Sequence, residues 1–201
     1  MLFRSGIEID DKIVQVGRDY FDMNFPNLNV IVGDGRLGLD RSNKLYDIIA
    51  IDAYRPPYIP AHMTTLEFFT ICASHLTDTG VLTLNVGSTP GDRRLIDGLA
   101  TTMSQIFPSI HIMDIPGTLN TMIFATKQPT LPENFSANLV RLAGDPNTNP
   151  LLITTMSSTF TNLQDGYSTT TVFTDDLAPI EWIVNNMVVS FVLQGGLEFL
   201  Q

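Results

Sequence analysis

The feature that most constrains the fold is a short apolar run, Ile48–Ile51, which lies between two acidic residues, Asp47 and Asp52. The run lacks the alternation of apolar and polar residues expected of a strand with one face in water. Continuous apolar strands of this length are typical of parallel sheets, in which helices cover both faces. The run therefore predicts a strand that is buried on both faces of an α/β fold.

The first two thirds of the chain repeat this pattern of apolar strands and amphipathic helices. Further strands are predicted at Gly6–Ile9, Leu28–Val32, Val81–Val86, Ile110–Ile115 and Thr121–Thr126. Helices are predicted after Asp10 or Asp11, over Arg36–Arg41, from Thr64 or Thr65 to Leu76, and from Asp92 to Phe107. The alternation predicts a mostly parallel sheet that ends in an antiparallel pair. We expect residues 1–128 to form this core.

The remaining residues, 129–201, predict a C-terminal extension. Asn134–Leu142 has a helical pattern, whereas Gly144–Thr171 is rich in Thr, Ser, Asn and Pro and predicts a loop. A last helix is expected to open at Thr174, with Asp175 and Asp176 at its positive end.

Charge and composition exclude several classes of protein. Eleven basic and twenty-one acidic residues give a net charge of −10, which argues against a nucleic-acid surface. The negative field suits a cationic substrate, although ordinary acidic proteins have it too. The single cysteine and the three scattered histidines indicate neither a disulfide framework nor a metal site. The best membrane candidate, Trp182–Leu197, is too short to span a bilayer, so we expect a soluble, cytoplasmic protein.

Three acidic residues lie at the end of a predicted strand or just past it: Glu8, Asp34 and Asp52. In open α/β sheets, ligands bind beyond the carboxyl ends of the strands. There Glu8 can accept hydrogen bonds from ribose hydroxyls and Asp34 from an adenine amine, while Gly35 lets the backbone approach the ring. The alternative is that each acid only caps the following helix. The spacing favours a nucleoside site without identifying a reaction.

Three segments together resemble the successive signatures of spermidine synthases and their spermidine-synthase-like relatives. They are Gly6-Ile7-Glu8-Ile9-Asp10, Val32-Gly33-Asp34-Gly35-Arg36 and Tyr46-Asp47-Ile48-Ile49-Ala50-Ile51-Asp52, and the resemblance extends to Gln128. The segment Thr174–Glu181 is similar to a tail motif of the spermidine-synthase-like branch. The resemblance implies a Rossmann-like fold of the class I methyltransferase type.

The resemblance also implies an activity. Glu8 matches the residue that binds the ribose of decarboxylated S-adenosylmethionine, Asp34 and Gly35 match the adenine-binding pair, and Asp52 matches the catalytic aspartate. The implied reaction transfers an aminopropyl group from this co-substrate to an amine, without a metal or a covalently bound cofactor. Asp52 would orient the ammonium group and help to remove its proton. The family further implies a homodimer.

The loop after Asp52 departs from the family. Where relatives have a second aspartate three positions on, this chain has Arg55. A guanidinium there should repel a diamine and suits a carboxylate on the acceptor or on S-adenosylmethionine itself, unless it only pairs with a nearby acid. Tyr54 and Tyr58 can form a wall of the amine site by cation–π attraction, or can anchor the loop on the core.

The beginning of the chain also departs from the family, because no strand and Gly-x-Gly loop precede Gly6. In this fold the missing strand lies between the strands of Glu8 and Asp52, so both should show an unpaired edge unless a segment such as Val188–Leu193 fills the gap. We expect the chain alone to bind its ligand weakly. An S-adenosylmethionine-dependent methyltransferase and an inactive, truncated remnant stay open as alternatives.

Overall fold

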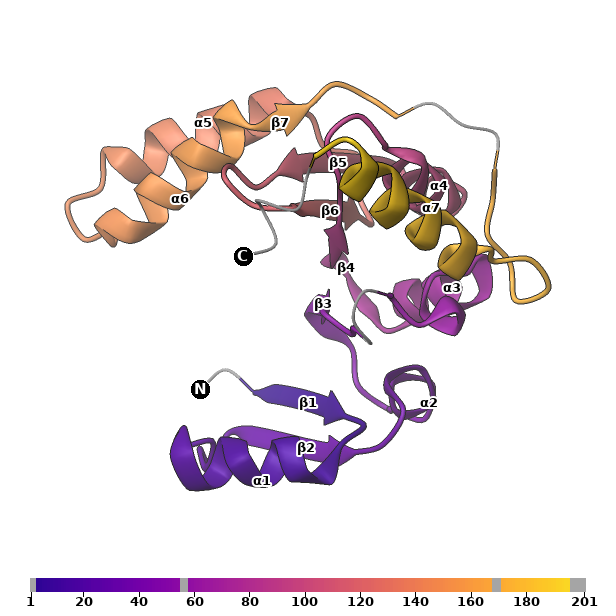
Figure 1. Cartoon of the computed structure of the whole chain (residues 1–201). Helices are drawn as coiled ribbons and strands as arrows, with labels where there is room; N and C mark the ends of the chain where they lie inside the picture. Colours follow the sequence, from indigo (N-terminus) through magenta and orange to yellow (C-terminus); the bar gives the residue numbers. More distant parts are fainter. Residues whose placement is uncertain (1–2, 55–57, 168–170, 196–201) are drawn as a thin grey trace. The chain divides into compact units, whose positions relative to one another are not determined.

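The computed structural model describes residues 3–54, 58–167 and 171–195 (Figure 1). The chain forms two compact units, Met1–Lys44 and Leu45–Gln201. Each unit has its own strands and helices, and each is described by itself below. The expected division into a core of residues 1–128 and an extension of residues 129–201 follows the family pattern rather than compactness, and it stays a prediction.

The first unit is a βαβα segment built on two parallel strands. Strand β1 (Arg4–Glu8) pairs with β2 (Leu28–Val32) in a register that places Glu8 opposite Val32. Helix α1 (Asp11–Tyr20) connects the strands, and α2 (Gly35–Asp40) follows the second one. Asp10 caps α1, since its carboxylate accepts a hydrogen bond from the Lys12 amide at 2.9 Å. The local pattern of the sequence therefore predicted this unit correctly.

The second unit contains a five-stranded sheet in the order β3-β4-β6-β5-β7. Its strands are β3 (Tyr46–Ile51), β4 (Leu76–Gly87), β5 (Ser109–Asp114), β6 (Asn120–Thr126) and β7 (Leu163–Gln164). Strands β3 and β4 are parallel, whereas the pairs β4–β6, β5–β6 and β5–β7 are antiparallel. The α/β class is thus confirmed, together with the antiparallel pair expected after the parallel strands. The described sheet of this unit is not mostly parallel as expected, because β6 and β7 both pair in the antiparallel sense.

Helices cover this sheet and supply much of its core. The short 3₁₀ helix η1 (Ala61–Met63) precedes α3 (Leu66–Ser74), and α4 (Arg94–Ser104) follows β4. Helices α3 and α4 contact β4 and β6, and α7 (Ile180–Leu193) contacts α4. Among the described residues, no helix is both long and apolar enough to cross a membrane.

The last helix begins six residues later than expected. Thr174 and Leu177 form a bridge instead of a helical turn, and α7 starts at Ile180. The reason is that Asp175 binds elsewhere: its carboxylate accepts a hydrogen bond from the Thr65 hydroxyl at 2.7 Å, and its amide donates one to the Glu67 carboxylate at 3.0 Å. Asp175 therefore lies at the N-terminus of α3, where the helix dipole favours a negative charge.

Phe173 fastens the same segment to the core. Its ring is fully buried, its amide donates a hydrogen bond to the Thr102 hydroxyl at 2.9 Å, and its carbonyl accepts one from Leu66 at 2.8 Å. The ring lies so close to Gly98 in α4 that any side chain at Gly98 would overlap it. The segment before α7 is thus held by both α3 and α4.

The expected loop at Gly144–Thr171 is wrong over twelve of its residues, which form helix α6 (Pro150–Thr161). Asn149 caps this helix through a hydrogen bond from the Leu151 amide at 2.9 Å, and Pro150 occupies the first turn, where it is well tolerated. Helix α6 lies against α5 (Pro132–Ala143), which confirms the helix expected there. Figure 1 shows the two helices as a hairpin that extends from the sheet.

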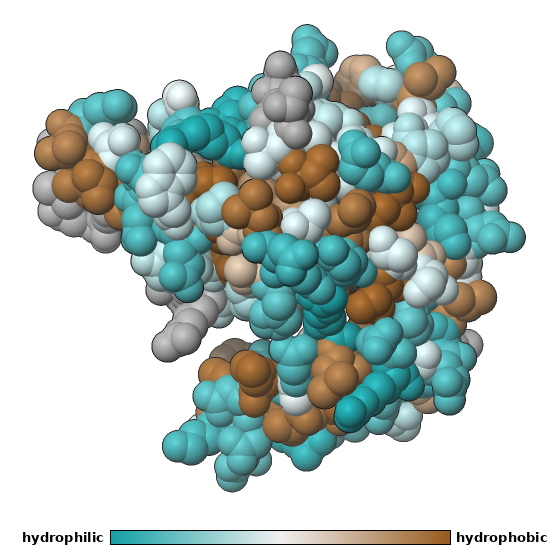
Figure 2. Space-filling model, turned by 90° about the vertical axis from the view of Figure 1, so that its right-hand side faces the viewer, coloured by the Kyte–Doolittle hydropathy of each residue, from teal (hydrophilic) through white to brown (hydrophobic). Residues whose placement is uncertain are grey.

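Strands β1 and β3 each pair with only one neighbour in the described residues. The unpaired edges expected on these two strands are therefore present in the described part of the chain. Strand β3 is not buried on both faces as expected, since Ile51 is 5% exposed but Ile48 is 66% exposed. The main helix contacts of this sheet fall on β4, β5 and β6. Figure 2 shows other apolar side chains that reach the surface. The proposal that Val188–Leu193 fills the gap is wrong, because these residues are helical.

The packing around His111 predicts a stability that depends on pH. A ring nitrogen of His111 lies 2.8 Å from the Thr130 hydroxyl, and burial lowers the pKa of the imidazole. Because the pKa in the folded state lies below the unfolded value of about 6.5, the unfolded chain binds the proton more readily. We therefore expect stability to be full above about pH 6.5 and to fall as the pH drops towards the folded-state pKa.

Urea unfolding at about pH 7.5 and about pH 5 measures this effect, with His111→Asn as the control that lacks the titrating group. The unmodified chain should lose more stability between these two pH values than the His111→Asn variant does. An equal loss of stability in both proteins would contradict the assignment to His111.

Candidate functional site

The first unit brings two of the predicted acids, Glu8 and Asp34, to the carboxyl ends of its two parallel strands. Glu8 is the last residue of β1 and lies opposite Val32 at the end of β2. Its carbonyl accepts a hydrogen bond from the Gly33 amide at 2.9 Å, and its carboxylate accepts one from the Asp10 amide at 3.0 Å. The carboxylate is thus held beyond the end of the strand. Glu8 does not cap α1, since Asp10 does so.

Asp34 does cap a helix, as the alternative interpretation expected. Its carboxylate oxygen Oδ1 accepts a hydrogen bond from the Leu37 amide at 2.8 Å at the start of α2, and Gly35 is the first residue of that helix. A cap of this kind stabilises a helix by about 1 kcal/mol. Recognition of a base by Asp34 would therefore be a second role for a carboxylate that already has a structural one.

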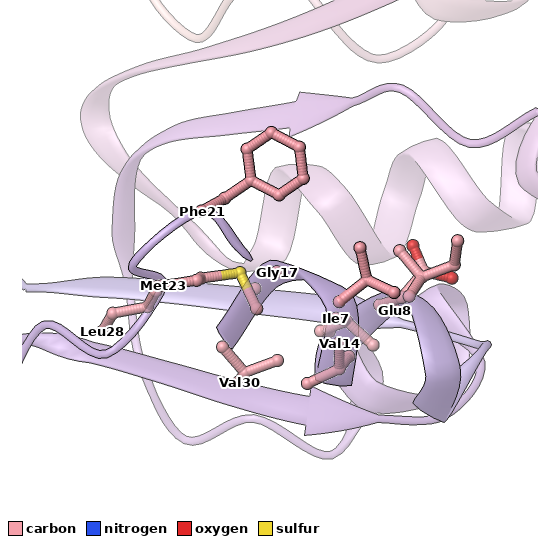
Figure 3. Close-up of a pocket in the computed structure, with 11 residues that line it drawn as sticks. Ile7, Glu8, Val14, Gly17, Phe21, Met23, Leu28 and Val30 are labelled. Carbon is pink, nitrogen blue, oxygen red and sulfur yellow. The ribbon is translucent and has the colours of Figure 1, made fainter. Parts of the chain in front are cut away.

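A cavity in this unit lies beside Glu8, but Asp34 and Gly35 are not among its lining residues. It has a volume of about 310 Å³ and lies between α1 and the two strands (Figure 3). Apart from Glu8 its lining is apolar or glycine: Gly6, Ile7, Ile13, Val14, Val16, Gly17, Phe21, Met23, Leu28 and Val30. The cavity therefore shares Glu8 with the nucleoside site that the sequence predicts, but neither Asp34 nor Gly35 lines it.

The second unit places Asp52 in a polar cluster with two other residues. Asp52 follows β3 and is exposed, and its carboxylate accepts a hydrogen bond from the Asn85 side-chain amide at 3.0 Å. The next helical element, η1, begins only at Ala61 and follows Pro60. In the part of the chain that the structure describes, Asp52 therefore caps no helix, unlike Asp34.

Tyr54 completes this cluster. Its hydroxyl donates a hydrogen bond to the Asn85 carbonyl at 2.8 Å. Burial raises the pKa of Tyr54 to about 12, with a smaller contribution from the negative charge of Asp52. The phenol therefore stays protonated at neutral pH and can neither take a proton from a substrate nor add a second negative charge.

Asn85 was not predicted from the sequence. Its side-chain oxygen Oδ1 is buried and has no hydrogen-bond partner among the described residues. The orientation of the amide has a clear electrostatic reason, because Asp52 needs a donor and would repel an oxygen. The available signal was a polar residue inside the apolar run Val81–Val86, on the strand that pairs with β3.

The other predicted substrate residues have different outcomes. Arg55 lies outside the described residues. Tyr58 donates a hydrogen bond to the Asn185 side-chain oxygen on α7 at 2.6 Å, as expected if it anchors the loop. In the part of the chain that the structure describes, no three His, Cys, Asp or Glu side chains are grouped as a metal site would require. The two units contain separate halves of the predicted site, and their convergence on one crevice stays a prediction.

Comparison with known proteins identifies a family. A family model described as the spermine/spermidine synthase domain matches residues 5–138. The chain is 31% identical over 190 residues to a probable polyamine aminopropyl transferase of Bifidobacterium longum, covering 88% of this chain and 42% of that protein. It is 30% identical over 130 residues to a polyamine aminopropyltransferase of Vibrio vulnificus, covering 63% of this chain and 42% of that protein.

Solved structures show a similar fold. A probable spermidine synthase from Corynebacterium glutamicum has a TM-score of 0.60 at 22% identity and covers 82% of this chain and 64% of its own. Human methyltransferase-like protein 13 in complex with SAH has a TM-score of 0.56 at 22% identity, covering 86% and 77%. At these identities the likeness shows the fold alone.

These likenesses define the class of protein as the α/β fold that spermidine synthases share with a methyltransferase-like protein. Since the family model matches more than half of the chain, the chain belongs to the spermine/spermidine synthase domain family. It spans less than half the length of the two curated relatives described above.

Proposed function

We propose that this chain carries the nucleoside-binding and amine-activating residues of an aminopropyltransferase. The observation that carries the proposal is the polar cluster of Asp52, Tyr54 and Asn85 at the end of β3. Asp52 is exposed and ionisable, has no capping role and is oriented by a fixed donor. The names of the relatives, which are polyamine aminopropyltransferases, support the same reaction.

In the proposed reaction, the acceptor amine binds as an ammonium ion against the Asp52 carboxylate. Loss of one proton to Asp52 or to water gives the nitrogen the lone pair that it needs to attack. A nitrogen–carbon bond then forms at the aminopropyl carbon next to the sulfonium of decarboxylated S-adenosylmethionine. The carbon–sulfur bond breaks, its electron pair stays on sulfur, and neutral methylthioadenosine leaves. No covalent enzyme intermediate is required.

The proposal also assigns residues to the nucleoside and to the acceptor. Glu8 binds the ribose hydroxyls, and Asp34 with Gly35 binds the adenine, as in the family signature that they match. Tyr54 presents its ring to the cationic amine, and Arg55 selects an acceptor that carries a carboxylate. A panel of amines with and without a carboxylate tests the assignment of Arg55. Homodimerisation and a cytoplasmic location stay predictions from the family resemblance.

The nucleoside site predicts a specific response to two substitutions of Asp34. Serine is a helix cap comparable with aspartate but lacks the carboxylate, whereas alanine removes both functions. We expect the chain to bind methylthioadenosine with a dissociation constant of about 0.1–1 mM, because the contacts proposed for the nucleoside are limited to Glu8, Asp34 and Gly35. Asp34→Ser should weaken binding by about tenfold, which corresponds to one charge-assisted hydrogen bond.

Titration of the chain followed by nuclear magnetic resonance measures this affinity. Asp10→Ala is the matched control, since it removes the cap of α1 and no proposed ligand contact. If Asp34→Ser binds as well as the unmodified chain while Asp34→Ala unfolds more easily, Asp34 is only a helix cap. Replacing methylthioadenosine by S-adenosylhomocysteine in the same experiment distinguishes an aminopropyltransferase from a methyltransferase by the preferred product.

A further inference from the structure

The cavity beside Glu8 follows from a missing side chain in β1. The strand register places Gly6 opposite Val30, and both residues line the cavity. A Cβ atom added to Gly6 would meet no atom of the described chain within 4 Å, so no part of the protein fills the space at this position. Protein interiors normally leave few voids larger than a water molecule. A cavity of about 310 Å³ is large enough to hold a small ligand.

The cavity is open to solvent beside α1. Three of its lining side chains, Ile13, Val16 and Phe21, are exposed, whereas Val14 on the same helix is buried. The lining therefore runs from the interior of the unit to its surface. Apolar side chains that are exposed together often mark a binding site, and here they leave a route by which a small molecule can enter without unfolding the chain.

The charge that the cavity carries lies at one end. Among the eleven described residues that line it, Glu8 alone is charged, and Figure 3 shows Glu8 at the end away from Met23 and Leu28. One carboxylate oxygen accepts a hydrogen bond from the Asp10 amide at 3.0 Å. A carboxylate has about four lone-pair sites, so Glu8 can also accept hydrogen bonds from an ammonium group. The cavity is thus suited to a ligand with an apolar body and one cationic end.

The opposite end favours an aromatic ring over an alkyl chain. The Met23 side chain lies against α1 at Gly17, where an added Cβ atom would be 2.8 Å from its terminal methyl group. A thioether and a phenyl ring, as in Met23 and Phe21, both make favourable contacts with aromatic rings. A rigid ring also loses less conformational freedom on binding than a flexible chain does.

We propose that this cavity binds a small aromatic amine, with its ring among the apolar side chains and its ammonium group on Glu8. A cavity of about 150 Å³ can hold benzene, so a volume of about 310 Å³ suits two fused rings. The site differs from the one proposed for the acceptor amine, because Asp52 belongs to the other unit and does not line the cavity. The two proposed ligands of the first unit share Glu8, so the amine should compete with the ribose.

Titration of the chain with naphthylmethylamine, followed by nuclear magnetic resonance, tests the proposal. We expect saturable binding with a dissociation constant of about 0.1–1 mM, which is ordinary for a ligand of this size. Neutral naphthylmethanol should bind about tenfold more weakly, the effect of one charge-assisted hydrogen bond, and anionic naphthylacetate more weakly still. Glu8→Gln keeps the size of the side chain and should make the amine and the alcohol bind equally.

Gly6→Val tests the cavity itself. The added side chain occupies the open space, and valine suits a strand better than glycine does, so the unit should keep its stability. Binding of the amine should weaken by about tenfold or more, because the volume that the ring needs is filled. Gly87→Val is the matched control, since Gly87 ends β4 in the other unit and an added Cβ atom there also meets no atom within 4 Å.

The outcomes separate this proposal from the proposed function. Absence of saturable binding overturns the site, as does binding that Gly6→Val leaves unchanged. If Gly6→Val loses stability, Glu8→Gln decides, and an unchanged preference for the amine in that variant overturns the role of the carboxylate. A dimer that Ile13→Asp dissociates, without binding of the amine, would assign the opening to a second copy of the chain. Asp34→Ser should weaken binding of methylthioadenosine and leave the amine unaffected, so either site can fail without the other.

Discussion

Replacing Phe173 with alanine is expected to lower the free energy of unfolding of the unit Leu45–Gln201 by about 3–5 kcal/mol. The ring is fully buried against Gly98 in α4, so its removal leaves a cavity that the rigid helix cannot fill. The backbone contacts of Phe173 with Thr102 and Leu66 also lose the packing that holds them in place. Few other single substitutions in this chain should cost as much.

Trp182 gives a convenient measurement, because it is the only tryptophan of the chain and lies in α7, within the same unit. Urea unfolding followed by its fluorescence reports on this unit alone. Phe21→Ala is the control, since that ring is 77% exposed in the other unit and should have little effect on the transition. A loss below about 1 kcal/mol for Phe173→Ala would show that the segment before α7 is not part of the core.

The second large effect is expected at Asp52. Asp52→Asn keeps the shape of the side chain but removes the charge that holds the ammonium ion and accepts its proton. We expect the rate of methylthioadenosine release to fall by about 10³-fold, or about 4 kcal/mol in the activation free energy. The Asn85 amide would also face a neutral partner in place of a carboxylate.

Asp47→Asn is a matched control for this substitution. Asp47 lies at the other end of the same strand, and its carboxylate accepts a hydrogen bond from the Thr77 hydroxyl at 3.1 Å. It is the same change of charge far from the carboxyl end of β3, and it should leave turnover within about twofold. Equal losses in the two variants would indicate a general effect of charge, and activity retained in Asp52→Asn would exclude Asp52 as the catalytic residue.

The parts of the fold that the sequence predicted are those that local patterns determine. Glu8 is the last residue of β1, Asp34 comes two residues after β2 and Asp52 comes directly after β3, and each strand forms close to where it was expected. Asp10 illustrates why: its side chain caps the helix that starts at the next residue, so that nothing distant is needed to fix that boundary.

The parts that were predicted wrongly depend on distant contacts or on residues with mixed preferences. The start of α7 was placed at Thr174 because Asp175 resembles a helix cap, whereas its partner is Thr65, 110 positions away. Helix α6 was missed because Thr and Ser favour turns as well as helices, and the neighbouring α5 decides between them. Asn85 was missed because a single amide in a strand shows no periodicity.

Among the residues that the structure describes, β1 and β3 each have one unpaired edge, and these edges affect how the protein behaves in concentrated solution. An open strand presents amide and carbonyl groups to any other strand, and the exposed Ile48 makes such pairing between molecules more favourable. What opposes it is the net charge of −10, which keeps molecules apart at low ionic strength. At 0.1 M salt this repulsion extends only about 10 Å. Aggregation of the folded chain should therefore increase with the salt concentration and should not require unfolding.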